Sequence, residues 1–135
     1  MTIELWALTG MAIILFFALF SQQIVADRAY GAAYALSNRD ALPGPASPTV
    51  ERLGRTVRNH VEGLAVFTPL ILVAAAAGVS NPITRWAAIA AVAMRLLHFV
   101  FYAFGITPLR SFAWAIGFLL AVPAFVYGLI SGLGF

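Results

Sequence analysis

Polar side chains recur at helical spacing in the stretch RTVRNHVEG, which leads directly into LAVFTPLILVAAAAG, a run without a charged residue. Positions i, i+3, i+4 and i+7 of this stretch share one face of a helix; they are Arg55, Arg58, Asn59 and Glu62. Arginine forks bind carboxylates through paired, charge-assisted hydrogen bonds. Together these side chains predict a polar helix face that continues into an apolar segment and whose arginines can bind negative charge.

A second polar face is predicted further along the chain. It consists of residues at i, i+3 and i+7, namely Arg95, His98 and Tyr102. At a rise of about 1.5 Å per residue, Glu62 is expected at the depth of His98 and close to Arg95. The pair 58–59 is expected at the depth of Tyr102. Because ionisable residues inside a membrane are costly and mostly functional, we expect the two faces to meet or to line a shared cavity.

The arginines of these faces outnumber the carboxylates, so negative charge is missing. A bound anionic ligand would supply it, and lipid headgroups are the alternative. Glu62 and Arg95 could also form a purely structural ion pair between helices. His60 points away from the polar face of its own helix and is expected to be an interfacial residue.

The composition places these faces in a membrane. Of the 135 residues, 62% are hydrophobic and 10% are charged, whereas soluble domains contain about 25% charged residues. The chain has no cysteine, so a cysteine nucleophile or a cysteine metal site is excluded, and we expect no metal. The net charge of +3 is too small, and lies too much within the apolar segments, to indicate nucleic-acid binding.

Four apolar segments predict an all-α integral membrane protein, an antiparallel four-transmembrane-helix bundle that forms one domain over residues 1–135. The expected spans are residues 3–25, 49–78, 82–104 and 109–133. Short connections rich in glycine and proline favour up-and-down neighbours. Basic residues gather at the first and third connections, which we therefore expect to face the cytoplasm, with both termini on the opposite side.

The segments ERLGRTVRNHVEGLAVF and RLLHFVFYAFGITPLRS together resemble the MAPEG family, the membrane-associated proteins in eicosanoid and glutathione metabolism. The resemblance covers residues 50–114, and the four-span topology covers the whole chain. It implies a homotrimer with glutathione as co-substrate, bound between neighbouring subunits. The cytoplasmic end is also where free glutathione is abundant.

The resemblance also assigns residues. Those on the family's glutathione-binding positions are Arg58, Asn59, Glu62, His98, Tyr102, Arg110 and Ser111. Arg110 falls on the position that activates the thiol, so it is the expected catalytic residue. Less certain matches are Arg28, Arg55 and Arg95, and SNRDAL resembles a family motif that ends at Asp40. Trp114 departs from the family, because several members carry a tyrosine there.

The expected function is a glutathione-dependent transferase, with possible peroxidase activity, acting on a hydrophobic electrophile or lipid. Two alternatives remain open. One is a non-catalytic family member that binds lipid or glutathione. The other is a haem protein or a small transporter, with His60 and His98 as axial ligands, although these two histidines lie on different faces.

Overall fold

The computed structural model describes residues 1–134, and their regular structure is helical. The elements follow in the order α1 (Ile3–Tyr30), α2 (Ala32–Ala35), α3 (Pro48–Ala76), α4 (Pro82–Ala103), α5 (Thr107–Ala115), a π-helical turn η1 (Ile116–Leu120) and α6 (Ala121–Gly132). Within the described residues, four segments are long and apolar enough to cross a membrane: α1, α3, α4 and the continuous stretch Thr107–Gly132. The protein is therefore an all-α, multi-pass membrane protein, as predicted.

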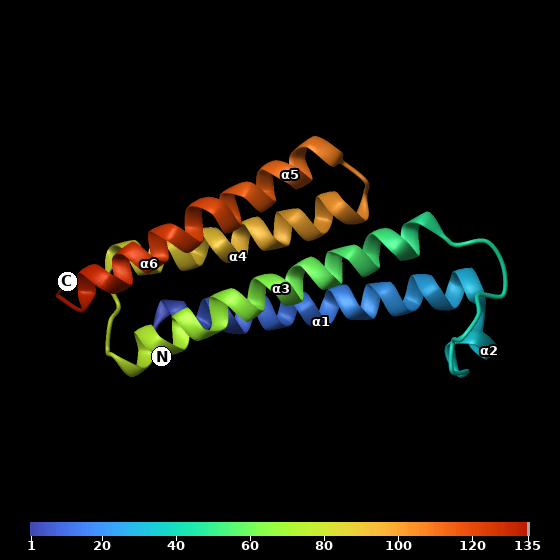
Figure 1. Ribbon diagram of the computed structural model, residues 1–135, viewed down its shortest axis with the longest axis horizontal. Helices are drawn as coiled ribbons and strands as arrows, with labels where there is room; N and C mark the ends of the chain where they lie inside the picture. Colours follow the sequence, from blue (N-terminus) through green and yellow to red (C-terminus); the bar gives the residue numbers. More distant parts are fainter. Residues whose placement is uncertain (135) are drawn as a thin grey trace.

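The helices run up and down in two pairs (Figure 1). α1 and α3 lie side by side in one pair, and α4 packs along α5, η1 and α6 in the other. Both chain termini and the α3–α4 connection lie at one end of the molecule, and the α1–α3 and α4–α5 connections lie at the other. We call the first the terminal end and the second the connection end.

Local sequence signals explain where the helices begin and end. Ser47 caps α3 through its side chain, and Pro48 occupies the first turn, where its missing N–H costs nothing. At α4, Asn81 and Thr84 form a reciprocal capping box. The first helix continues past residue 25, where its apolar run ends, to Tyr30, and it stops at Gly31, whose φ of 84° is accessible mainly to glycine.

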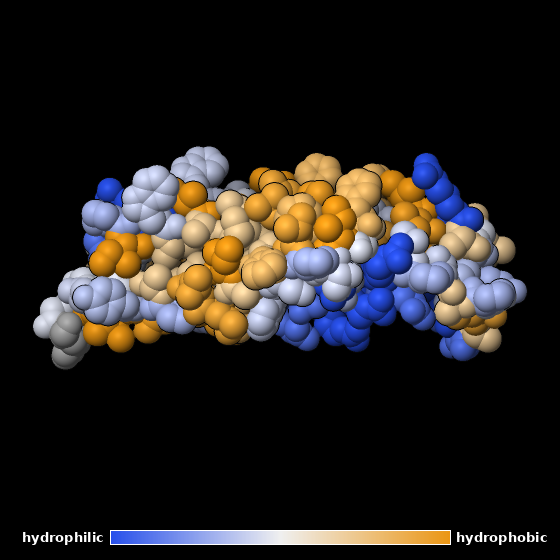
Figure 2. All heavy atoms as spheres, turned by 90° about the horizontal axis from the view of Figure 1, so that it is seen from above, coloured by the Kyte–Doolittle hydropathy of each residue, from blue (hydrophilic) through white to orange (hydrophobic). Residues whose placement is uncertain are grey.

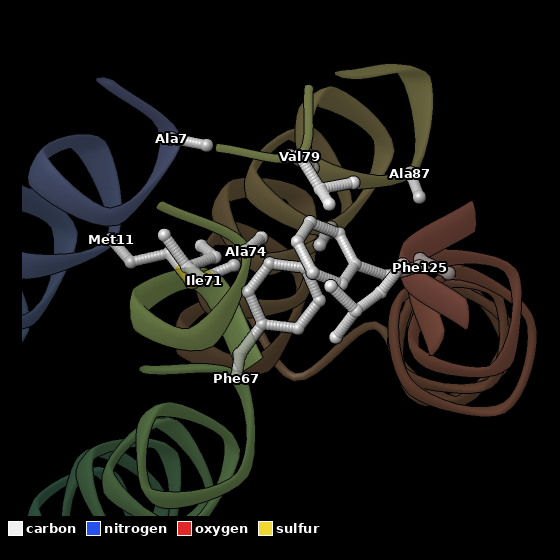
Figure 3. Packing of buried hydrophobic residues seen from close by; sticks show 12 residues of the cluster. Ala7, Met11, Phe67, Ile71, Ala74, Val79, Ala87 and Phe125 are labelled. Atoms are coloured by element: carbon white, nitrogen blue, oxygen red, sulfur yellow. The ribbon is translucent and has the colours of Figure 1, made fainter. Parts of the chain in front are cut away.

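The interior changes character along the bundle. At the terminal half, rings and small side chains pack together, with the Phe67 and Phe125 rings 5.2 Å apart and Ile71 fully buried beside them (Figure 3). The inward face of α4 shows the same change: its buried residues are Thr84 and three alanines near the terminal end, and then Arg95, His98 and Tyr102 towards the connection end. The apolar half therefore holds the helices together, and the polar half is left for a site.

The fourth span is not a regular α-helix throughout. It contains the π-helical turn η1 just before Pro123. Proline has no N–H for the carbonyl four residues earlier and its ring crowds that carbonyl, which here belongs to Leu119 within η1. A locally wider turn accommodates both effects, and such turns are frequent at functional sites.

The surface shows the same division. Apolar side chains cover a broad band along the molecule, and hydrophilic side chains gather towards the connection end (Figure 2). Exposed large apolar residues occur on every spanning segment, among them Phe16, Leu72, Trp86 and Leu119. This outer surface suits contact with lipid or with other membrane helices.

Candidate functional site at the connection end

The polar face of α4 points into the bundle. Arg95, His98 and Tyr102 are 7%, 5% and 7% exposed, respectively. They occupy successive turns of one helix face, so their side chains form a ladder that ends at the α4–α5 connection. The predicted inward orientation of this face is confirmed.

Tyr102 lies between two arginines from different helices. Nε of Arg55 on α3 donates a hydrogen bond to the Tyr102 hydroxyl over 3.2 Å. Cζ of Arg110 on α5 lies 4.4 Å from the centroid of the Tyr102 ring, which is cation–π geometry. The tyrosine therefore fixes two positive charges near each other, and its own hydroxyl proton remains available to a ligand.

His98 holds the beginning of α5. Its Nδ1 lies 3.0 Å from the backbone carbonyl oxygen of Arg110, and because a carbonyl only accepts, Nδ1 carries the proton. The other ring nitrogen, Nε2, is buried without a hydrogen-bond partner among the described residues. In the neutral ring Nε2 is then an acceptor, so the arrangement offers a ligand one buried acceptor.

Arg95 links α4 to α3 further into the bundle. Its Nη1 donates to the backbone carbonyl of Asn59 over 3.2 Å. The guanidinium lies directly against the backbone of Gly63, where an added Cβ atom would come within 2.5 Å of Cζ. Gly63 is therefore required for the place of Arg95, and the sequence analysis missed it. The available signal was a glycine inside a helical polar face.

These elements enclose a pocket of about 210 Å³, which we call the α4–α5 pocket. Its lining residues are Asn59, His98, Tyr102, Arg110, Ser111 and Trp114. Trp114 follows Arg110 by one turn and stacks on Phe118, with centroids 5.5 Å apart and planes 18° apart. The pocket thus joins a polar wall that bears Arg110 to an aromatic wall that continues along the fourth span.

Other predicted site residues lie outside this pocket. Arg58 and Glu62 are exposed on the surface of the single subunit. Arg58 lines, with Arg55 and Glu51, a second hollow of about 470 Å³ between α1 and α3. Arg28 is exposed near the end of α1 and lines neither cavity.

The register between α3 and α4 differs from the prediction by about one turn. Tyr102 is hydrogen-bonded to Arg55 and not to the pair 58–59, although Asn59 lines the same pocket as Tyr102, and Arg95 meets the carbonyl of Asn59. The Glu62–Arg95 ion pair, which the sequence left open as an alternative, does not form within 4 Å in residues 1–134. α3 ends at Ala76, two residues before the predicted end, which shifts its depth scale by about 3 Å in this direction, and the length of the arginine side chains accounts for the rest.

Two further residues correct the sequence analysis. His60 is not an interfacial residue: it is 3% exposed, and its Nε2 lies 2.9 Å from the carbonyl oxygen of Met11 in α1. It points away from the polar face, as predicted, but that direction leads into the α1–α3 contact. Glu4 was overlooked, although it is 1% exposed at the terminal end and accepts hydrogen bonds from Thr84 (2.6 Å) and Ser80 (3.2 Å).

The buried face of α3 explains why the predicted polar face, which runs from Arg55 to Glu62, is divided between two environments. The buried residues of α3 at the connection half are Leu53, Thr56, His60 and Gly63. Asn59, next to this buried face, is half-buried at the α4–α5 pocket, and Arg58 and Glu62 lie on the outer side of the helix. A single subunit therefore has Asn59 of this polar face at its pocket and Arg58 and Glu62 on its outer surface.

Comparisons with known proteins agree with this architecture. The family model of the MAPEG family matches residues 5–130, which is nearly the whole chain. No curated protein and no solved structure matches the chain. The matched region contains the polar ladder of α4 and all but the outermost residues of the four apolar spans. The chain belongs to the MAPEG family, whose members are membrane proteins of eicosanoid and glutathione metabolism.

Proposed function

We propose that this protein is a membrane-embedded glutathione transferase that conjugates hydrophobic electrophiles. The observation that carries the proposal is the position of Arg110. Its guanidinium lies over the Tyr102 ring, its backbone is held by His98, and it lines a pocket with Ser111 and Trp114. A fixed positive charge thus lies between a polar wall and an apolar wall.

The charges of glutathione complement the residues around this pocket. The tripeptide carries two carboxylates, one ammonium and a thiol. Arg55, Arg58 and Arg95 supply guanidinium groups for the carboxylates. Glu62 takes the ammonium, and Asn59 hydrogen-bonds a peptide group. Ligand binding would balance the surplus of arginines, which is why an anionic ligand is favoured over a purely structural role for them.

Arg110 acts on the thiol in this account. A thiol with a pKa near 8.5 is largely protonated at neutral pH, and a neighbouring cation favours the thiolate. The thiol proton passes to water, the sulfur forms a bond to the electrophilic carbon, and the leaving group departs with its bonding electrons. Ser111 lines the pocket beside Arg110. Its hydroxyl donates to the backbone carbonyl of Thr107 over 3.3 Å and would have to turn from it to donate to the sulfur. Trp114 and Phe118 provide the apolar wall for the electrophile.

A single subunit gives an incomplete site. The α4–α5 pocket of about 210 Å³ is smaller than the roughly 300–1,000 Å³ usual for ligand sites. Arg58 and Glu62 are exposed on the subunit, and charged side chains in a bilayer rarely face lipid. Both facts support a homotrimer in which a neighbour covers the outer face of α3, with Arg28 as a candidate contribution from the neighbour's α1.

The orientation follows from the distribution of arginine. Arg28, Arg39 and Arg52 lie in or beside the α1–α3 connection, and Arg110 lies in the first turn of α5. Basic residues favour the cytoplasmic side of a membrane. We infer that the connection end faces the cytoplasm and that both termini lie on the opposite side. The α4–α5 pocket would then open towards the compartment in which glutathione is abundant.

The test combines binding and turnover on one detergent-purified sample. Calorimetry should give saturable glutathione binding, and a chloronitrobenzene-type electrophile should be conjugated at a rate that saturates with glutathione. Binding without turnover of this or of a lipid hydroperoxide would favour the non-catalytic alternative. Absence of glutathione binding would contradict the proposal altogether.

A further inference from the structure

A third cavity, distinct from the two described above, lies at the connection end, at the corner between α1, α2 and the beginning of α3. It has a volume of about 270 Å³. We call it the corner pocket, and the residues that matter for its chemistry are Gln23, Asp27, Tyr30, Tyr34, Arg39 and Glu51. It shares no lining residue with the α4–α5 pocket, but it shares Gln22, Val50 and Glu51 with the hollow that contains Arg55 and Arg58. The proposed function assigns no role to the residues that line the corner pocket.

Two carboxylates and one guanidinium line the corner pocket, so its side chains carry a net negative charge. Oδ1 of Asp27 accepts a hydrogen bond from Gln23 over 2.6 Å. No other side-chain hydrogen bond to the Asp27 carboxylate occurs in residues 1–134, which leaves Oδ2 for a ligand. Glu51 has a single long ion-pair contact, 3.8 Å to Arg55, and remains half exposed.

Two tyrosine rings form an aromatic corner beside these carboxylates. The rings of Tyr30 and Tyr34 are 5.2 Å apart at an interplanar angle of 67°. The backbone N–H of Ser47 donates to the Tyr30 hydroxyl over 2.8 Å, which ties the tyrosine to the loop before α3. Aromatic faces next to carboxylates are typical of sites for organic cations.

Arg39 provides the one positive charge of this pocket. Its backbone has φ 61°, a left-handed conformation that is uncommon for a residue other than glycine. Its Nη2 donates to the carbonyl of Ala35 (3.1 Å) and to the amide oxygen of Gln23 (3.4 Å), so the side chain is held over the pocket. The remaining N–H groups of the guanidinium can bind a phosphate.

We propose that the corner pocket binds the headgroup of a zwitterionic phospholipid that carries a primary ammonium. The ammonium lies against Tyr30 and Tyr34 and donates to Asp27 and Glu51, and the phosphate lies on Arg39. A lipid is favoured over a soluble amine because the pocket begins where the apolar run of α1 ends, at Val25. The apolar walls of the pocket, Ala26, Leu42 and Val50, can contact the glycerol and the first part of the chains.

Native mass spectrometry of the detergent-purified protein tests this site. Phosphatidylethanolamine and phosphatidylglycerol of equal chain length are added in turn, and the bound lipid is counted as a function of concentration. We expect tighter binding of phosphatidylethanolamine. Asp27→Asn keeps an acceptor for Gln23 but removes the charge, and should weaken that binding about ten- to a hundredfold. Asp40→Asn is the matched control, since it removes one carboxylate charge from the nearby loop, outside the pocket.

A pair of variants at Tyr34 separates lipid binding from loss of fold. Tyr34→Phe keeps the ring and should retain binding, whereas Tyr34→Leu should weaken it about two- to tenfold. Free phosphoethanolamine identifies the source of the ligand. If phosphoethanolamine displaces the lipid only at a concentration far above that of the lipid, the ligand is a membrane lipid, as proposed. Displacement at a concentration equal to that of the lipid would contradict the proposal. Equal binding of both lipids, unchanged by Asp27→Asn and Tyr34→Leu, would overturn the proposal.

Discussion

The imidazole of His98 holds the backbone of Arg110, with Nδ1 3.0 Å from the carbonyl oxygen. This contact joins the last turns of α4 to the first turn of α5 across a short connection. It makes the place of the Arg110 guanidinium depend on a buried residue of the preceding span. The second nitrogen of the same ring is left as an acceptor at the pocket.

The two nitrogens of His98 can be tested separately. Asparagine places an amide near Nδ1, and glutamine places one near Nε2. We expect His98→Asn to keep the thiolate absorbance of bound glutathione but to weaken glutathione binding by about tenfold, the cost of one lost hydrogen bond with a buried group. His98→Gln should keep binding and lose thiolate. Identical behaviour of both variants would contradict separate roles.

The thermal stability of the protein should depend on the close contact between Gly63 and the guanidinium of Arg95. Gly63→Ala places a Cβ atom within the guanidinium of Arg95, so that side chain must leave its position. We expect destabilisation by about 1–3 kcal/mol, as for other overpacked interiors, measured as a lower Tm in detergent. The control is Gly10→Ala in α1, whose Cβ would meet Val92 at an ordinary 3.4 Å. A Tm of Gly63→Ala at or above that of the control would contradict the close packing.

Glu62 provides a different test, because its side chain is exposed and forms no ion pair within the described subunit. Glu62→Gln keeps the shape and removes a charge-assisted bond worth about 1.5–3 kcal/mol. Glutathione affinity should then fall roughly ten- to a hundredfold, and the Tm should change little. A lower Tm with unchanged affinity would show that Glu62 is a structural partner instead.

Trp114 should contribute to the reaction with the electrophile and not to glutathione binding. Trp114→Ala removes an aromatic wall of the α4–α5 pocket and its stack on Phe118. We expect kcat/KM for an aromatic electrophile to fall about two- to tenfold, while calorimetric affinity for glutathione is kept. Phe112→Ala is the matched control, since Phe112 is exposed on the same helix and lines neither pocket. An equal loss in both variants would point to a general effect of the membrane surface.

Much of the fold follows from the sequence because lipid imposes simple rules. Four long apolar runs must become helices, and their bounds agree with the structure to within a few residues, apart from α1, which extends to Tyr30. The inward face of α4 was also predictable, because charged residues at helical spacing are unlikely to face lipid. The π-helical turn was not predictable, since a proline in an apolar run indicates a kink but not the type of turn that forms there.

The arrangement of the site was only partly predictable. Helix spacing shows which residues share a face, but not which sector of that face packs on a neighbour, so His60 was expected at the membrane interface although it is buried between α1 and α3. The register depended on the end of α3 and on how far the arginine side chains reach, so the bond from Arg55 to Tyr102 was not predicted. The burial of Glu4 depends on hydroxyls some 80 positions away, which periodicity does not reveal.

The thiolate absorbance of bound glutathione, recorded without any electrophile, tests the central claim most directly. The parent protein should show a thiolate signal at neutral pH when glutathione is added. Arg110→Ala should bind glutathione within a few fold but lose most of that signal, because removal of a neighbouring cation raises the thiol pKa by about one to a few units. The signal should return at higher pH, and in part with lysine at this position. Equal thiolate signals in the parent and in Arg110→Ala would contradict the role given to Arg110.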